Sequence, residues 1–170
     1  MKFSLFAVAA LASTAVADLA SIQASLNEVS KRVTGVKTKL DAWKGDLLGT
    51  IPIVAASADL VVTLQINTLK IKQSGNLTDD EAIEVSGTTA ELITNTIPVL
   101  DALVAARPKF DKLLLRPIIY LSLLTQKDST LDLSRAVVSK LPPVYAEIGE
   151  ALIQELIGLF DNVLTVYKPF

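Results

Sequence analysis

Apolar side chains recur between residues 22 and 43 in alternating steps of four and three. The series consists of Ile22, Leu26, Val29, Val33, Val36, Leu40 and Trp43. Steps of this size return to the same face of an α-helix, so the segment is predicted to form an amphipathic helix of about six turns. Lysine and arginine occupy its other faces, and because Asp18, Glu28 and Asp41 interrupt them, they indicate a solvated surface rather than a membrane-binding stripe.

The next two segments are also predicted to be helical. A second helix is expected over about residues 51–73, after a turn rich in glycine. A third helix is expected to begin at Thr78, which forms a capping box with Glu81. It should continue to about residue 107, with a kink at Pro98.

The rest of the chain is predicted to form further helices. Pro108 is expected to open a fourth helix that contains Pro117, because proline is favoured in the first turn. The polar segment QKDST at residues 126–130 is expected to end it. A short helix over about 131–141 and a last helix over about 144–166 follow. Since no strand-like alternation appears, the predicted fold class is all-α, a bundle of five to six amphipathic helices with short loops.

The start of the chain, MKFSLFAVAALASTAVA, has the pattern of a secretory signal peptide. A lysine precedes an apolar core, and Ala-Val-Ala at 15–17 fits a small-x-small cleavage site. The apolar part is shorter than the ~20 residues that a membrane span needs. We therefore expect residues 1–17 to be removed and residues 18–170 to form a single domain. The mature chain is expected to be secreted, extracellular or in the cell wall, without an integral membrane span.

The composition excludes several classes of function. Cysteine and histidine are both absent, which rules out disulfides, thiolate or imidazole metal sites, and catalytic sets built on Cys or His. A net charge of −2 does not suit a nucleic-acid-binding protein. The acidic residues at 79–81 are explained by their place in the first turn of a helix. A carboxylate-pair hydrolase would need a second converging carboxylate, and none is predicted, so we expect no enzyme, no metal and no cofactor.

The sequence is more hydrophobic than an ordinary secreted fold requires, and the excess is aliphatic. Apolar residues make up 51% of the chain and aromatic residues 5%, with a mean hydropathy of +0.47. Helical wheels place small hydroxyl side chains among aliphatic residues on the inward faces. A single inward Ser or Thr usually bonds the carbonyl four residues before it. Together, however, smooth aliphatic walls with occasional hydroxyls are typical of an apolar ligand pocket, and the bundle is expected to enclose an elongated cavity.

The wheels also predict which residues line this cavity. They are Ser57, Val61, Leu64, Thr68, Ile71, Ser86, Thr89, Ile93, Thr96, Leu100, Leu114, Ile118, Leu121, Thr125, Ile148, Leu152 and Leu159. One hydroxyl of this set is expected to hold the polar head of a ligand, and the candidates are Ser57, Thr68, Thr89, Thr96 and Thr125.

Two further surface features follow from the same reading. The opposite face of the second helix carries Asp59, Thr63, Asn67 and Lys70, and we expect it to be exposed to solvent. The sequon Asn76-Leu77-Thr78 falls in the predicted loop between the second and third helices. Asn76 is therefore a predicted glycosylation site.

Two stretches of the chain carry a resemblance to a known family. LVAARPKFDK at residues 103–112 and VVSKLPPVYAEIGEALIQELIGLFDNVLTVY at residues 137–167 are similar to sequences of the fungal hydrophobic surface-binding protein A family, which includes the antigenic cell-wall galactomannoproteins. This resemblance implies a secreted helical bundle that adsorbs to hydrophobic surfaces. For the mannoprotein members it also implies an internal tunnel that holds long-chain fatty acids.

Two functions are consistent with these observations. The first is a non-catalytic carrier, expected to be monomeric, that holds a fatty acid or similar amphiphile in its cavity, with a hydroxyl at the head group. The second is a structural or adhesive protein that adsorbs to hydrophobic surfaces and has no specific ligand. A continuous internal cavity would favour the carrier, whereas a core filled by side chains would favour the adhesive protein.

Overall fold

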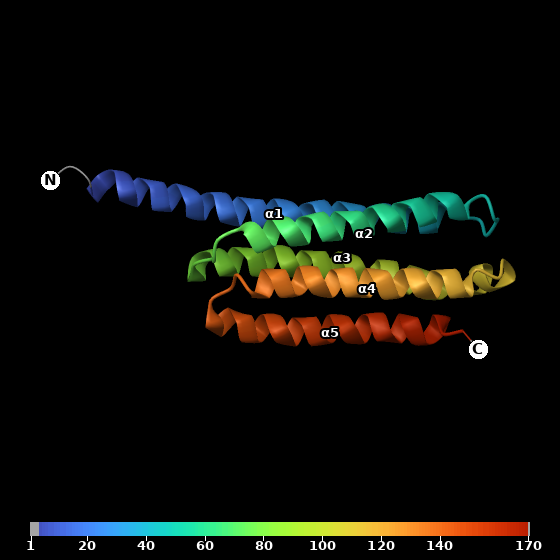
Figure 1. Cartoon of the computed structure of the whole chain (residues 1–170). Coiled ribbons are helices and arrows are strands. Elements are labelled where there is room, and N and C mark those ends of the chain that lie inside the picture. Colours follow the sequence, from blue (N-terminus) through green and yellow to red (C-terminus); the bar gives the residue numbers. More distant parts are fainter. Residues whose placement is uncertain (1–3, 170) are drawn as a thin grey trace.

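Over residues 4–169, the part of the backbone that is described, the computed structural model contains five α-helices and no strand. They are α1 (Ser4–Ala42), α2 (Thr50–Gln73), α3 (Asp79–Lys112), α4 (Arg116–Val138) and α5 (Pro143–Tyr167). The helices lie side by side, and consecutive helices run in opposite directions (Figure 1). The predicted all-α bundle is confirmed. Side chains are described for residues 18–169.

The helices are arranged as a closed ring. α1 packs against α2 and α3, α2 packs against α4, and α5 packs against both α4 and α3. α3 and α4 contact each other only weakly across the middle. Because each helix turns one face toward the centre of the ring, the central space is bounded by all five of them.

The first turns of α1 extend beyond the end of the other helices (Figure 1). Residues 1–3 lie outside the described backbone, and the side chains of residues 1–17 lie outside the described side chains. The signal peptide and the boundary at residue 18 therefore stay predictions.

The apolar stripe on α1 is buried, as its spacing predicts. Its members, from Ile22 to Trp43, have exposed fractions of 6% or less. The bounds of α2 and α5 also agree closely with the predicted 51–73 and 144–166. At the start of α3, Glu81 N donates to Thr78 Oγ1 at 3.4 Å and Thr78 N donates to Glu81 Oε2 at 2.8 Å. This is the predicted capping box, and it fixes where α3 begins.

The predicted start of a helix at Pro108 is wrong. α3 runs through Pro108 to Lys112, and the chain turns at residues 113–115 instead. Phe110, two residues after the proline, is completely buried. Proline within a helix removes one backbone hydrogen bond, and here the packing of the following turn offsets that loss. Pro117 lies in the first turn of α4, where no donor is needed.

The predicted break at residues 126–130 is also wrong, because α4 is continuous there. Part of this segment packs against the rest of the folded chain. Gln126 and Ser129 are buried, and Lys127 Nζ pairs with Asp161 Oδ1 of α5 at 2.6 Å. Tertiary contacts thus keep helical a segment whose local composition favours a turn.

One face of α2 differs from its predicted exposure. Asp59 and Lys70 are exposed, but Thr63 and Asn67 are buried, so half of that prediction is wrong. Asn67 Nδ2 donates to Glu28 Oε2 of α1 at 3.1 Å and to the Thr63 carbonyl at 2.9 Å. The hydrogen bond to Asn67 also holds the pKa of Glu28 below its usual value. The contact between α1 and α2 therefore includes a polar pair beside its apolar stripe.

An aromatic cluster lies at one end of the bundle. Trp43 and Phe110 have ring centroids 4.3 Å apart, and Phe110 meets Tyr167 edge-on at 6.2 Å. Tyr167 Oη donates to the Leu103 carbonyl at 2.6 Å. These contacts tie α1, α3 and α5 together at the end where α1 meets α2.

Two helices of the described part, α2 and α3, are long and apolar enough to cross a membrane by length and composition alone. Core helices of water-soluble bundles meet the same criteria. Both helices belong to the ring, where α2 packs on α1 and α4, and α3 packs on α1 and α5. The expected absence of a membrane span in the mature chain stays a prediction.

Candidate functional site

A narrow apolar channel occupies the centre of the ring. Its volume is about 130 Å³, and residues from all five helices line it. On α3 the lining extends from Val85 to Leu103, which corresponds to about 27 Å along the helix axis. A small volume spread over this length describes a tube rather than a chamber.

Part of the predicted lining is found in this channel. The residues that do line it are Leu64, Ser86, Thr89, Ile93, Thr96, Leu100, Ile148 and Leu152. Most belong to α3, whose capping box set the start of the helix correctly. Their contact with a ligand stays a prediction.

On α2 and α5 some of the predicted residues lie outside the channel lining. Ile71 is buried in the core, and Thr68 lines a separate small pocket between α2 and α4. Ser57, Val61 and Leu159 are half-buried and lie outside the channel lining. The inward direction of α2 passes through Leu60 and Leu64, about 40° around the helix from the direction that the helical wheel predicts.

The α4 predictions are wrong. Leu114, Ile118 and Leu121 are 85%, 54% and 62% exposed, and Thr125 is exposed as well. The wheel assumed one helix from Pro108 onward, but the turn at residues 113–115 resets the helical phase. The face of α4 that reaches the channel instead carries Gln126, Thr130, Leu133, Ser134 and Val137.

Sequence reasoning missed several residues of the channel. The predicted break at residues 126–130 interrupts the helical period of α4. For that reason Gln126, Thr130 and Ser134 are not among the predicted lining residues. Tyr145 and Gly149 line the channel at the start of α5. A 3.6-residue period continued through 116–138 would have recovered the α4 residues.

Thr89 differs from three other channel hydroxyls in its hydrogen bonding. Ser86, Thr96 and Ser134 each donate to the carbonyl four residues earlier, at 2.7, 2.8 and 2.9 Å. Thr68 and Thr125, outside the channel, do the same. Thr89 Oγ1 is buried and has no hydrogen-bond partner among the described residues. A buried polar atom without a partner is costly in an empty site, so the Thr89 hydroxyl is available to a ligand.

The channel opens near the first turns of α3 and α5. Ile148 lines it and is nevertheless 58% exposed, and Ser86 is exposed as well. α3 and α5 run in the same direction (Figure 1), and the Tyr167 bond to Leu103 fixes their relative height. Ser86 precedes Leu103 by 17 residues and Ile148 precedes Tyr167 by 19 residues. At 1.5 Å per residue, both therefore lie about 26–29 Å along the helix axes from this hydrogen bond, at a similar level in the bundle. The mouth thus lies far from the aromatic cluster.

The channel lining contains no positive charge within the described residues. The lining has no Asp, Glu, Lys or Arg. On α3 up to Ala106 and along all of α5, every charged residue is acidic. No group of three or more potential metal ligands occurs in the described part of the chain, and Glu81 is engaged by the capping box. The arrangement suits the binding of an apolar chain with a small uncharged head.

Comparison with known proteins identifies the family. The sequence profile of the family described as hydrophobic surface binding protein A matches residues 19–139. The chain belongs to this family. No curated protein matches it in sequence.

Solved structures share the fold of this family member. AFMP4P in complex with palmitic acid has a TM-score of 0.85 at 19% identity, covering 88% of this chain and 99% of that one. Ligand binding domain 1 of the Penicillium marneffei MP1 protein, complexed with arachidonic acids, has a TM-score of 0.85 at 16% identity, with 89% and 99% covered. Its ligand binding domain 2, with multiple arachidonic acids, has a TM-score of 0.82 at 15% identity, with 89% and 96% covered. At these identities the likeness establishes the fold.

Proposed function

We propose that the protein is a secreted, non-catalytic carrier that holds a long-chain fatty acid or similar amphiphile in the central channel. The observation that carries this proposal is a continuous apolar tube lined by all five helices. Proteins of the same fold have been solved with palmitic and arachidonic acids, which supports it. An extracellular or cell-wall location and a monomeric state belong to the same proposal.

The geometry suggests how the ligand lies. Thr89 follows the mouth residue Ser86 by one helical turn, and Leu103 lies fourteen residues further along the channel. This distance corresponds to about 21 Å, long enough for an extended acyl chain beyond the head group. Because the channel volume is only about 130 Å³, the lining side chains must move apart to admit such a chain. We place the head at Thr89 and the tail toward Leu103 and Phe160. Removal of each methylene from water contributes ~0.8 kcal/mol before the costs of binding.

The head group should be bound in its uncharged form. A buried carboxylate needs a cation or several donors, and without them its pKa rises. The described lining offers hydroxyls and one amide, and no cation. A fatty acid is therefore expected to bind protonated, and a fatty alcohol to bind comparably well.

Displacement of a fluorescent fatty acid from delipidated protein by palmitic acid tests the proposal. Thr96→Phe places a ring in the channel and should abolish stoichiometric binding. Thr94→Phe, on the exposed side of the same helix, is the matched control and should bind like the wild type. If delipidated wild-type protein binds no fatty acid, or if both variants bind equally, the carrier function is wrong.

Surface adsorption is a second candidate, favoured by the outer face of α2. Ile51, Val54, Val62, Ile66 and Leu69 are about half exposed or more, and their spacing places them along one side of the helix. Adsorption with opening of the bundle predicts loss of the near-ultraviolet circular dichroism signal on polystyrene beads. Retention of that signal on the beads would argue against opening.

Glycosylation of Asn76 also remains a proposal. Asn76 is exposed in the segment between α2 and α3, which suits a glycan that projects into solvent. The hydroxyl of Thr78, the third residue of the sequon, is engaged by Glu81 in the folded chain. Attachment before folding is therefore expected, and a mass shift on glycosidase treatment of secreted protein would test it.

A further inference from the structure

One end of the bundle combines exposed leucines with lysines. We call it the basic end and define it by the turn between α1 and α2 (residues 43–49) and the turn between α3 and α4 (residues 113–115). Both turns lie at the same end of the molecule (Figure 1). Lys109 Nζ donates to the Trp43 carbonyl at 3.1 Å, and Trp43 stacks on Phe110. These contacts hold the two turns side by side.

The leucines at this end are held out of the core. Leu47, Leu48 and Leu114 are 59%, 76% and 85% exposed. The turn that carries the first two is well ordered, because Asp46 Oδ2 accepts from Gly49 N at 2.7 Å and Thr50 Oγ1 donates to the Leu47 carbonyl at 2.6 Å. Their exposure is therefore a feature of the folded chain.

Leu114 is the most unusual of them. Its φ is 59°, in the left-handed region where residues that carry a bulky side chain are rarely found. Glycine or asparagine would suit this backbone better. Neither burial nor conformation explains a leucine here, and such an outlier suggests a role outside folding.

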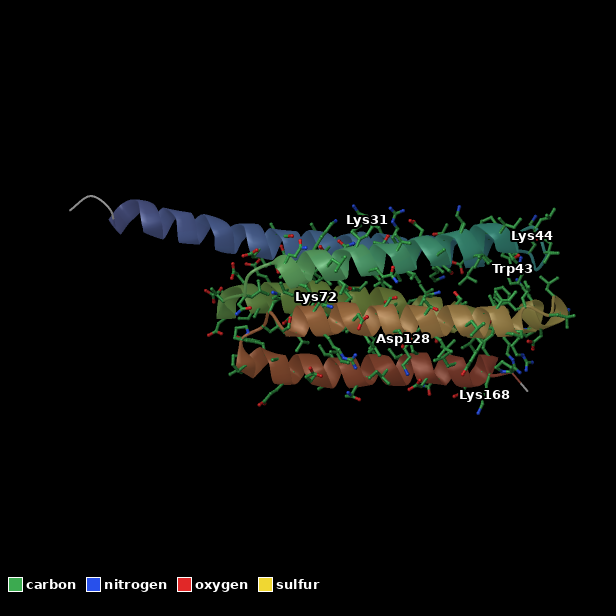
Figure 2. The ribbon with its side chains drawn as sticks, in the orientation of Figure 1. Lys31, Trp43, Lys44, Lys72, Asp128 and Lys168 are labelled. Carbon is green, nitrogen blue, oxygen red and sulfur yellow. The ribbon has the colours of Figure 1, made fainter. Side chains whose placement is uncertain are left out.

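Unpaired lysines surround these leucines. Lys39, Lys44, Lys112 and Lys168 are exposed, and none forms an ion pair with a carboxylate in the described part of the chain. Figure 2 shows Lys44 and Lys168 at this end, with Trp43 beside Lys44. Asp111 is already paired with Arg116, and Asp46, which accepts from Gly49 N, is the one carboxylate within the two turns. The basic end therefore carries a positive charge, in contrast to the acidic α3 and α5 sides.

We propose that the basic end docks onto a lipid bilayer that carries anionic head groups. Leu47, Leu48 and Leu114 enter the interface, and the lysines contact the head groups. The bundle stays folded and stands end-on. The mouth of the channel, at the other end, then faces solvent. This inference goes beyond the carrier function and does not depend on ligand binding.

Flotation with vesicles tests the proposal. The wild type should bind vesicles of phosphatidylcholine mixed with phosphatidylserine, and bind phosphatidylcholine alone much more weakly. Added salt should weaken the binding, because it screens exposed charges. Leu114→Asn should weaken it roughly ten-fold through the lost apolar insertion. The matched control is Val144→Asn, since Val144 is 73% exposed at the opposite end, and it should bind like the wild type.

A second pair of variants tests the contribution of the lysines to vesicle binding. A measurement of thermal stability then shows whether a variant loses binding because it unfolds. Lys44→Glu should weaken binding, whereas Lys31→Glu, on the side of α1 (Figure 2), should leave it nearly unchanged. Leu114→Asn should keep or raise the Tm, because asparagine tolerates the backbone at this position. Equal binding to neutral vesicles, or equal effects of the end and control variants, would overturn the proposal. Dimerisation of the wild type that Leu114→Asn abolishes would instead make this end a contact between copies.

Discussion

Replacement of Thr89 by valine tests the head-group position most sharply. Valine keeps the β-branched shape while it removes the hydroxyl. In the empty channel Thr89 Oγ1 is buried and unpartnered, so the substitution breaks no internal hydrogen bond. It should leave the free energy of unfolding unchanged or raise it by about 1 kcal/mol, because an unsatisfied buried hydroxyl is itself costly.

The effect on binding should have the opposite sign. Loss of one hydrogen bond to the ligand head costs about 0.5–1.5 kcal/mol, which corresponds to roughly 2- to 13-fold weaker binding. Thr96→Val is the matched control, since the Thr96 hydroxyl already donates to the Leu92 carbonyl. Displacement titrations and thermal unfolding of both variants give the two quantities. Unchanged affinity in Thr89→Val, or an equal loss in Thr96→Val, would refute the head-group position.

Three further predictions concern pH and stability. Affinity for palmitic acid should fall as pH rises from the pKa of the free acid toward the higher pKa of the bound acid and level off above it, whereas affinity for hexadecanol should stay constant, as parallel titrations would show. Burial raises the pKa of Tyr167, so its stabilising effect is present below the ordinary tyrosine pKa of about 10 and is lost above it. Tyr167→Phe should lower the free energy of unfolding by about 1–2 kcal/mol at neutral pH and lessen the alkaline loss in urea titrations. The hydrogen bond from Arg116 lowers the pKa of Asp111, so its stabilising effect is lost as pH falls below about 4. Asp111→Asn should therefore lower the free energy of unfolding at neutral pH and lessen its further fall as pH drops below about 4, as urea titrations at several pH values would show. If the variant loses as much stability on acidification as the wild type, this prediction is contradicted.

The fold was largely predictable because its strongest signals are local. The period of four and three on α1 and the Thr78 capping box each determine structure within a few residues, and both are confirmed. The turn at residues 113–115 carries no such signal, because a leucine stands where glycine would normally mark a left-handed residue. One misplaced turn then rotated the whole predicted face of α4.

The sequence predicts that an apolar channel exists, but it predicts only some of the residues that line it. Aliphatic walls with sparse hydroxyls indicated a cavity, and α3 supplied several of its residues. Which hydroxyl is free depends on hydrogen bonds that every inward Ser or Thr can make in a helix. The structure separates Thr89 from Thr96 by a single hydrogen bond, and sequence alone treats them alike. The burial of Asn67 likewise depends on Glu28 of another helix.

The most direct test of the channel is an NMR experiment on the complex with palmitic acid carrying a carbon-13 methyl terminus. We expect contacts from this methyl group to Leu103 and Phe160, which line the deep part of the channel. A label at the carboxyl carbon should report a raised pKa, and Thr89→Val should change its signal. Methyl contacts to Val62 and Ile66 on the exposed face of α2, or no protein contacts at all, would contradict the account.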